Sequence, residues 1–300
     1  MLEMAAASAG GAIYWVDLGL KEGIDLGFFT LKYYSLAYLF GILLAYWHLS
    51  KMIKQPGAPM AQRHADDLFT YCTLGVIIGG RLGYATFYQP ELWTTFVPDT
   101  FVSWGVLRLW DGGMSFHGGL VGVLVAIALV SWRGGLSFMR VCDYIAVNVG
   151  FGMLFGRIAN FINGELWGRP VLSEVPWAMI FPGAGPEPRH PSQLYQALGE
   201  GFTVMVVMLC LFWFTRARYR TGVLVGTFTV LISVARFVVE FYRQPDAQLA
   251  EFAERTGLSM GQWLTIPLIV AGVALVIWAL ARSRKAPAGK EDAKPDMGAA

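Results

Sequence analysis

Charged residues and cysteine are both scarce in this chain. Only 15% of the 300 residues are charged, against about 25% in an average soluble domain, and the formal net charge is only +2. This balance excludes a highly charged disordered chain and argues against a nucleic-acid partner. The three cysteines, Cys72, Cys142 and Cys210, lie far apart inside apolar segments and form no CxxC pair, which argues against a disulfide framework.

Histidine is equally sparse, and no zinc-binding spacing is present. The four histidines are His48, His64, His117 and His190. None of them belongs to an HExxH motif, and no cysteine pair supplements them. The sequence therefore predicts no metal site.

Long apolar runs dominate what is present. Hydrophobic residues make up 55% of the chain and the mean hydropathy is +0.49, while a membrane-spanning helix needs about 20 apolar residues. The 35 glycines favour close helix packing. We expect an all-α membrane protein, a polytopic bundle of seven transmembrane helices. The predicted spans are about 31–50, 68–88, 113–132, 141–162, 200–215, 221–241 and 262–281.

Basic residues predict the orientation of these spans. They are concentrated in alternate loops and the C-terminal tail, at Lys51, Lys54, Arg63, Arg133, Arg140, Arg216, Arg218, Arg220, Arg282, Arg284, Lys285, Lys290 and Lys294. By the positive-inside rule these segments are cytoplasmic. The N-terminus is then periplasmic or extracytoplasmic and the C-terminus cytoplasmic. Because no basic stretch precedes the first apolar run, we interpret it as a span and not as a cleaved signal peptide.

Three regions of different character follow from this topology. Residues 1–30 form an extracytoplasmic N-terminal arm, residues 31–281 the seven-span domain, and residues 282–300 a basic, disordered cytoplasmic tail. The long outer loops 89–112 and 163–199 contain many Pro, Trp and Gly residues. We expect these loops to form a small extracytoplasmic cap.

Four polar side chains fall inside different predicted spans at a similar depth. They are Arg81, His117, Arg157 and Arg236. Counted inward from the outer span ends at about 1.5 Å per residue, all four lie roughly 6–11 Å below the outer surface. An arginine near a span centre costs about 2.5–3.5 kcal/mol, so such a layer needs a reason.

A phospholipid headgroup supplies that reason. The planar guanidinium matches phosphate geometry, and the phosphates of the outer leaflet lie near this depth. The alternative is snorkelling or internal ion pairing, for example between Arg236 and Glu240 at i,i+4. We favour a headgroup pocket open to the outer leaflet, because four separate spans contribute to the layer.

Local motifs surround these residues. Glycines flank His117 in WDGGMSFHGGLVG, and Arg157 and Asn160 lie one helical turn apart in GRIANFINGELWGRP. The segment RHPSQLYQ has no GxSxG elbow, so Ser192 is a poor hydrolase nucleophile. Arg236 and Glu240 share a helix face in RFVVEFYRQPD, where a structural salt-bridge network is an equally good interpretation.

Five strings together resemble one family, the bacterial prolipoprotein diacylglyceryl transferases. They are GGRLGY (79–84), WDGGMSFHGGL (110–120), GRIANFINGELWGRP (156–170), RHPSQLYQ (189–196) and RFVVEFYRQPD (236–246). The resemblance runs from about residue 30 to 281. It implies an enzyme of the bacterial cytoplasmic (inner) membrane that moves the diacylglyceryl group of phosphatidylglycerol onto the lipobox cysteine of a prolipoprotein signal peptide. A thioether forms, glycerol phosphate leaves, and no cofactor is used.

The resemblance also implies roles for matching residues. Arg157 and Arg236 become the leading catalytic and phosphate contacts, and His117 the candidate thiol base, although an arginine-dominated site without a strong base is an open alternative. Further phosphatidylglycerol-binding residues are Tyr34, Asn160, Glu165, Gly168 and Glu240, with Arg81, Asp111, His190 and Arg243 in a second tier. The chain departs from the family at Ile232, where members can carry a tyrosine.

Two other functions compete with the transferase. A transporter of an anionic solute or lipid would use the arginines as selectivity groups, but its site belongs near the membrane midplane. A scaffolding protein would gain nothing from buried arginines. None of the chain's cysteines is placed in the outer polar layer, so a covalent cysteine mechanism is disfavoured and the substrate must supply the sulfur.

Overall fold

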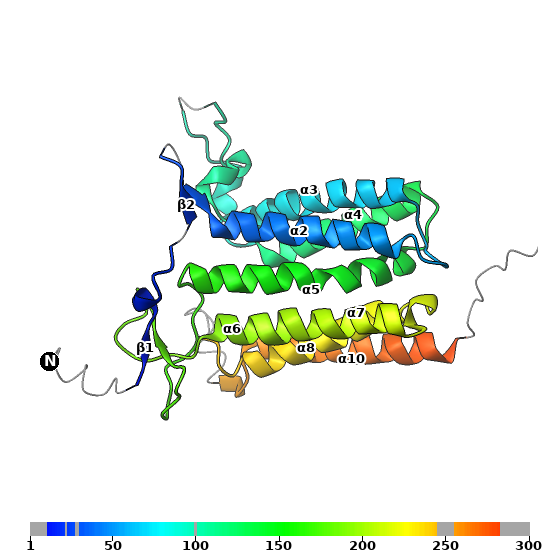
Figure 1. The fold of residues 1–300 in the computed structure, drawn as a ribbon. Coiled ribbons are helices and arrows are strands. Elements are labelled where there is room, and N and C mark those ends of the chain that lie inside the picture. The colour runs from blue at the N-terminus through cyan, green and yellow to red at the C-terminus, as the bar shows by residue number, and fades with distance from the viewer. Residues whose placement is uncertain (1–10, 22, 28–29, 99–100, 245–254, 283–300) are drawn as a thin grey trace, which may run out of the picture. The chain divides into compact units, whose positions relative to one another are not determined.

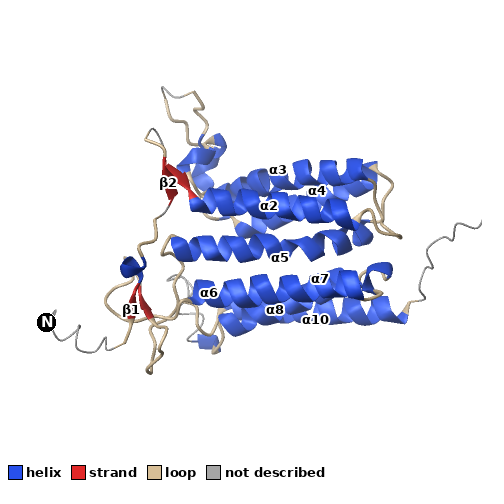
Figure 2. Cartoon of the chain, in the orientation of Figure 1, coloured by secondary structure: helices blue, strands red, loops and turns tan. Residues whose placement is uncertain are grey.

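The computed structural model describes residues 11–21, 23–27, 30–98, 101–244 and 255–282. Helices account for most of this part of the chain, as Figure 2 shows. The chain divides into two compact units, one formed by residues 49–142 and the other by the described parts of 1–48 and 143–300. Each unit is described by itself.

Each of the seven apolar stretches expected to span the membrane lies largely within a helix (Figure 1). The long helices are α2 (Tyr33–Met52), α3 (Gln62–Phe87), α4 (Phe116–Arg133), α5 (Phe138–Ile162), α7 (Val204–Phe214), α8 (Val223–Val239) and α10 (Met260–Ala281). Short α6 (Ser192–Gln196) and the π-helical η5 (Ala197–Thr203) precede α7, which gives a 23-residue helix from Ser192 to Phe214.

Within the described residues, five helices are long and apolar enough to cross a membrane: α3, α4, α5, Ser192–Phe214 and α10. Helix α8 is apolar but shorter, and α2 is outside the group because its tyrosines, Trp47 and His48 lower its hydropathy. Large apolar side chains of α10 such as Leu268 and Ile277 are exposed, as lipid-facing residues are. A mostly helical protein with several membrane-spanning helices is thus confirmed; the count of seven and the orientation of the termini stay predictions.

The structure contains short β-strands, which the expectation of an all-α fold did not include. Strand β1 (Ile13–Tyr14) pairs in parallel with β4 (Met179–Ile180), and β2 (Gly23–Asp25) pairs with β3 (Thr30–Lys32) in an antiparallel ladder. The first helix therefore begins two residues later than predicted, because residues 31 and 32 belong to a strand. The arm is joined to the loop that precedes α6.

A small apolar cluster fixes the arm on that loop. Trp15, in the 3-10 helix η1 (Trp15–Leu18), packs with the buried side chains of Met179 and Phe181. The Trp15 indole also donates a hydrogen bond of 2.8 Å to the carbonyl of Phe161, at the end of α5. These contacts join the arm to the loop before α6 and to the end of α5, while the extracytoplasmic cap expected of loops 89–112 and 163–199 stays a prediction.

Glycines set the close packing of helices inside each unit. In residues 49–142, a Cβ on Gly79 of α3 would lie 2.3 Å from the carbonyl oxygen of Gly118 in α4, so the two backbones touch. In the other unit, a Cβ on Gly201 would lie 2.6 Å from Cα of Leu154 in α5. Gly226 of α8 and Gly272 of α10 meet in the same way.

The loop between α3 and α4 is built from short 3-10 turns. These are η2 (Pro90–Trp93), η3 (Gly105–Leu107) and η4 (Leu109–Asp111), and a further turn, η6 (Ala217–Tyr219), lies between α7 and α8 in the other unit.

Candidate functional site

Arg157 and Arg236 converge on one buried carboxylate. Arg157 lies near the end of α5 and Arg236 near the end of α8. Between them Glu200 of η5 places Oε2 at 3.5 Å from Nη2 of Arg157, and Oε1 at 3.7 Å from Nη1 of Arg236. The Glu200 side chain is 2% exposed, whereas the two arginines are 22% and 26% exposed. The Glu200 carboxylate is therefore buried, whereas the guanidinium groups of Arg157 and Arg236 are partly exposed.

The ion pairs continue along the end of α8. Glu240 lies 3.1 Å from Arg236 and 3.7 Å from Arg243, and its side chain is 4% exposed. The linked chain therefore contains three guanidinium groups and two carboxylates. The partly exposed guanidinium groups of Arg157 and Arg236 are the part of this chain that an anionic ligand can reach.

The local helix geometry explains how Glu200 reaches both arginines. The π-helical segment Ala197–Thr203 is a type of helical widening that is frequent at functional sites. Gly199 faces Ala235 and Val239 of α8, and Gly201 faces Leu154 of α5. Small residues on both sides of Glu200 let the two neighbouring helices approach it.

Asn160 links this ion-pair chain to the loop that follows α5. Its Oδ1 accepts from Nη1 of Arg157 at 3.5 Å, and its Nδ2 donates to Oε1 of Glu165 at 2.8 Å. The amide of Gln193 donates to the backbone carbonyl of Glu165 at 2.7 Å. Leu166 then adopts a left-handed backbone with φ of 57°, so the loop turns sharply just beyond the polar side chains.

Gly168 is enclosed by backbone on two sides. Its amide donates to the carbonyl of His190 at 2.9 Å. A Cβ at this position would lie 2.5 Å from the carbonyl oxygens of both His190 and Tyr242. Gly168 thus lies where the loop after α5, the segment before α6 and the end of α8 meet. Any side chain at this position would clash with the backbone, so the position requires glycine.

His190 is held by two tyrosines. Its Nδ1 lies 3.1 Å from the hydroxyl of Tyr195, and its ring packs against that of Tyr242 with centroids 5.1 Å apart. Partial burial lowers the pKa of His190, so the imidazole is neutral near pH 7. Its contacts are those of a residue that positions the loop.

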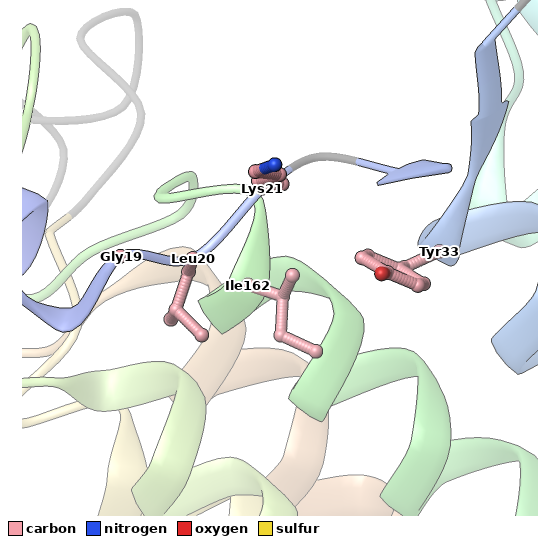
Figure 3. A pocket seen from close by; sticks show the side chains of 5 residues that line it. All are labelled: Gly19, Leu20, Lys21, Tyr33 and Ile162. Carbon is pink, nitrogen blue, oxygen red and sulfur yellow. The ribbon is translucent and has the colours of Figure 1, made fainter. Parts of the chain in front are cut away.

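Tyr34 belongs to a tyrosine pair in the first turns of α2. Its hydroxyl donates to that of Tyr38 at 3.2 Å, and a Cβ on Gly156 would lie 3.8 Å from the Tyr38 hydroxyl. The pair thus lies beside the part of α5 that carries Arg157. A pocket of 360 Å³ is lined nearby by Gly19, Leu20, Lys21, Tyr33 and Ile162 (Figure 3).

Arg81 has a different environment from the one the sequence suggested. It is 3% exposed, and its guanidinium donates to the carbonyls of Val106 at 2.9 Å and Gly105 at 2.8 Å, with further bonds to Gly112 and Gly113. All of these belong to residues 49–142. Backbone carbonyls therefore occupy the donors that a phosphate would need, and Arg81 holds the loop between α3 and α4.

Asp111 and His117 lie in the same unit as Arg81. The Arg108 guanidinium donates to Asp111 at 2.6 Å and holds the pKa of that carboxyl below its usual range. His117, in the first turn of α4, is exposed and contacts the ring of Phe116. The structure brings Arg157 and Arg236 together through Glu200. A shared membrane depth for all four residues, including Arg81 and His117, stays a prediction.

Glu200 is the residue that sequence reasoning missed. The predicted fifth span began at residue 200, which placed Glu200 at a helix end, where a charge needs no explanation. The helix begins at Ser192, so Glu200 lies about two turns inside. The spacing of Gln193, Gln196 and Glu200, a polar stripe on one helix face, is the signal that would have revealed it.

Among the described residues, no group of three or more His, Cys, Asp or Glu side chains is arranged to hold a metal ion. Among the described residues no disulfide joins the three cysteines, and Cys142 is buried.

Comparison with known proteins agrees with the sequence motifs. A family model described as prolipoprotein diacylglyceryl transferase matches residues 22–278. A protein of Erythrobacter litoralis named phosphatidylglycerol–prolipoprotein diacylglyceryl transferase is 64% identical over 93% of this chain and 96% of its own length. Proteins of the same name from Zymomonas mobilis and Gluconacetobacter diazotrophicus are 46% and 44% identical, over 87% and 86% of this chain and 88% and 90% of their own lengths. The chain belongs to the prolipoprotein diacylglyceryl transferase family.

Proposed function

We propose that this chain transfers the diacylglyceryl group of phosphatidylglycerol to the cysteine thiol of prolipoproteins, the first step of bacterial lipoprotein maturation. The sulfur forms a thioether bond to the terminal glycerol carbon of the diacylglyceryl group, and the bond from that carbon to the phosphate oxygen breaks. Glycerol phosphate leaves with the bonding electron pair. The thiol proton passes to a base or to water.

The observation that carries this proposal is the arginine pair held by the buried carboxylate of Glu200. The phosphodiester of phosphatidylglycerol is an anion, and the partly exposed guanidinium groups of Arg157 and Arg236 can bind it. Negative charge grows on the leaving phosphate as the carbon–oxygen bond breaks. Arg157 and Arg236, already fixed in place, would stabilise that charge without reorganisation.

The neighbouring residues take supporting roles in this account. Asn160 and Glu165 shape the headgroup pocket beside Arg157, Gly168 holds its loop, and Tyr34 borders it from α2. Glu240 orients Arg236.

The second-tier residues act mainly on the surrounding loops. Arg243 extends the positive charge at the end of α8, His190 supports the backbone around Gly168, and Arg81 and Asp111 order the outer loop of residues 49–142.

The nucleophile comes from the substrate. A cysteine thiol has an unperturbed pKa near 8.5, so it needs a base or a cationic environment to react. His117 is the candidate base because it matches the family motif WDGGMSFHGGL, and its side chain is exposed. An arginine-lined site that stabilises the thiolate directly is the alternative.

The membrane arrangement belongs to the same proposal. Seven helices cross the bacterial cytoplasmic (inner) membrane, with the N-terminus outside and the C-terminus inside. The ion-pair chain then faces the outer leaflet, where lipid and the lipobox cysteine of the prolipoprotein signal peptide meet. The arm and residues 163–199 cover this side.

The direct test uses purified protein, phosphatidylglycerol labelled in its acyl chains, and a lipobox peptide. We expect label on the peptide cysteine through a thioether, identified by mass spectrometry, and equal release of glycerol phosphate. A variant with Cys72, Cys142 and Cys210 replaced by alanine should transfer equally well. Absence of peptide label with well-folded protein would contradict the proposal.

A further inference from the structure

Gln196 is a buried carboxamide without a partner. It is the last residue of α6 and is 1% exposed. Among the described residues, neither its Nε2 nor its Oε1 has a hydrogen-bond partner. Gln193, one turn earlier, differs because its amide nitrogen donates to the carbonyl of Glu165.

The helix register places Gln196 in the polar region of the site. The contacts of Gly201 with Leu154 and of Gly150 with Met205 show that the helix from Ser192 to Phe214 runs antiparallel to α5. Moving five residues back from Gly201 to Gln196 therefore corresponds to moving forward from Leu154 to Ala159. Gln196 thus lies level with Asn160 and about one turn from Glu200.

A buried amide with both atoms unpaired is unfavourable for the folded protein. A ligand that completed its hydrogen bonds would remove this cost. The guanidinium groups of the site only donate and the carboxylates only accept, whereas a carboxamide does both. A hydroxyl is likewise donor and acceptor, so a carboxamide and a hydroxyl are complementary partners.

The headgroup of phosphatidylglycerol contains two hydroxyls beyond the phosphate. We propose that Gln196 binds a hydroxyl of the glycerol headgroup and thereby selects a hydroxyl-bearing phospholipid, while the arginines bind the phosphate. This inference rests on the proposed function and names a specificity residue for it. Binding of the phosphate by the arginines would not by itself require a carboxamide at Gln196.

The test compares two donor lipids, phosphatidylglycerol and phosphatidylpropanol, which keeps the phosphodiester and lacks both headgroup hydroxyls. Wild-type protein should show a kcat/KM about 10- to 100-fold higher for phosphatidylglycerol. Gln196→Met keeps the side-chain length and removes the amide. It should lower kcat/KM for phosphatidylglycerol, leave that for phosphatidylpropanol unchanged, and bring the preference to within about threefold.

Ser131→Ala is the matched control, because Ser131 of α4 also has a buried, unpartnered side-chain oxygen. It should keep the wild-type preference. A preference unchanged in Gln196→Met would overturn the inference. Equal use of both lipids by the wild type would overturn it without any variant, with the proposed function intact. No transfer from either lipid by the wild type would overturn the proposed function as well.

Discussion

Arg157 and Glu200 are 43 residues apart in the chain and meet at 3.5 Å inside one helical unit. Glu200 also lies 3.7 Å from Arg236, so one carboxylate separates two cations that would otherwise repel each other. The carboxylate is the buried member and the cations are the open ones. This is the arrangement of a site that presents positive charge to an anionic ligand from a fixed position.

Glu200→Gln should impair transfer although Glu200 does not itself bind the lipid in this account. The amide keeps the size of the side chain and removes its charge, so Arg157 and Arg236 lose their common anchor. Because a displacement of about 1 Å reduces rates about 100-fold, we expect a fall of that order in kcat with a smaller change in KM. Steady-state kinetics with phosphatidylglycerol and a lipobox peptide measures both.

Glu187→Gln is the control for this substitution, since Glu187 is 62% exposed and pairs with Arg189 only at 3.8 Å. Its kinetics should equal those of the wild type. Full activity in Glu200→Gln would show that the arginines do not depend on the bridge.

Gly168→Ala should destabilise the protein. The new Cβ would lie 2.5 Å from two carbonyl oxygens. These backbone atoms cannot move aside as the end of a flexible side chain can. A loss of about 1–3 kcal/mol is expected, visible as a lower Tm in detergent together with lower activity. Gly152→Ala is the matched control, because its Cβ would meet nothing within 4 Å and alanine favours helix by about 0.5–1 kcal/mol. Equal Tm values for the two variants would contradict the described backbone enclosure.

Arg81→Lys should loosen the loop between α3 and α4. The three donors of an ammonium lie on one nitrogen and cannot reach all the carbonyls that the five donors of the guanidinium reach, and each hydrogen bond from a charged donor contributes about 1.5–3 kcal/mol. Hydrogen exchange in residues 105–113 should quicken by at least about tenfold. Arg133→Lys, at an exposed position that donates to the Tyr71 hydroxyl at 3.3 Å, should leave exchange there unchanged. Unaltered exchange in Arg81→Lys would mean that the loop does not depend on Arg81.

Stability should depend on the protonation of His190. Its pKa is lowered by partial burial from the usual value near 6.5. Between the lowered pKa and about 6.5, the unfolded chain binds more protons than the folded one, so the free energy of unfolding falls as pH falls through this window and is constant above it. An NMR titration of labelled histidine, assigned with His190→Gln, should give a midpoint below 6.5. A midpoint at or above 6.5 would contradict the burial argument.

The helices were predictable from the sequence because long apolar runs are strong signals. The start at Ser192 was not, since Ser192, Gln193 and Gln196 are typical of loops. They are buried here because the bundle supplies partners for some of them, such as the carbonyl of Leu166 for Ser192. The pairing of Ile13–Tyr14 with Met179–Ile180 is too short and too distant in sequence to leave a pattern.

The candidate site was predictable only in part for the same reason. Arg157 and Arg236 stood out because a charge inside an apolar run is unusual. Glu200 was missed because its helix was predicted to begin there. Arg81 looked equivalent to the other arginines, yet the loop that returns over it provides carbonyl partners, and such a non-local return is not encoded in any local spacing.

The most direct test of the central claim measures both products of one reaction in Arg157→Ala and Arg236→Ala. Phosphatidylglycerol carries one label in the acyl chains and another in the headgroup, and the peptide carries the acceptor cysteine. The account predicts that wild-type protein releases one glycerol phosphate for each diacylglyceryl group transferred. It predicts that both variants, folded by circular dichroism and Tm, lose both products together by at least about 100-fold. Wild-type-like transfer in either variant would contradict the assignment of the phosphate to the arginine pair.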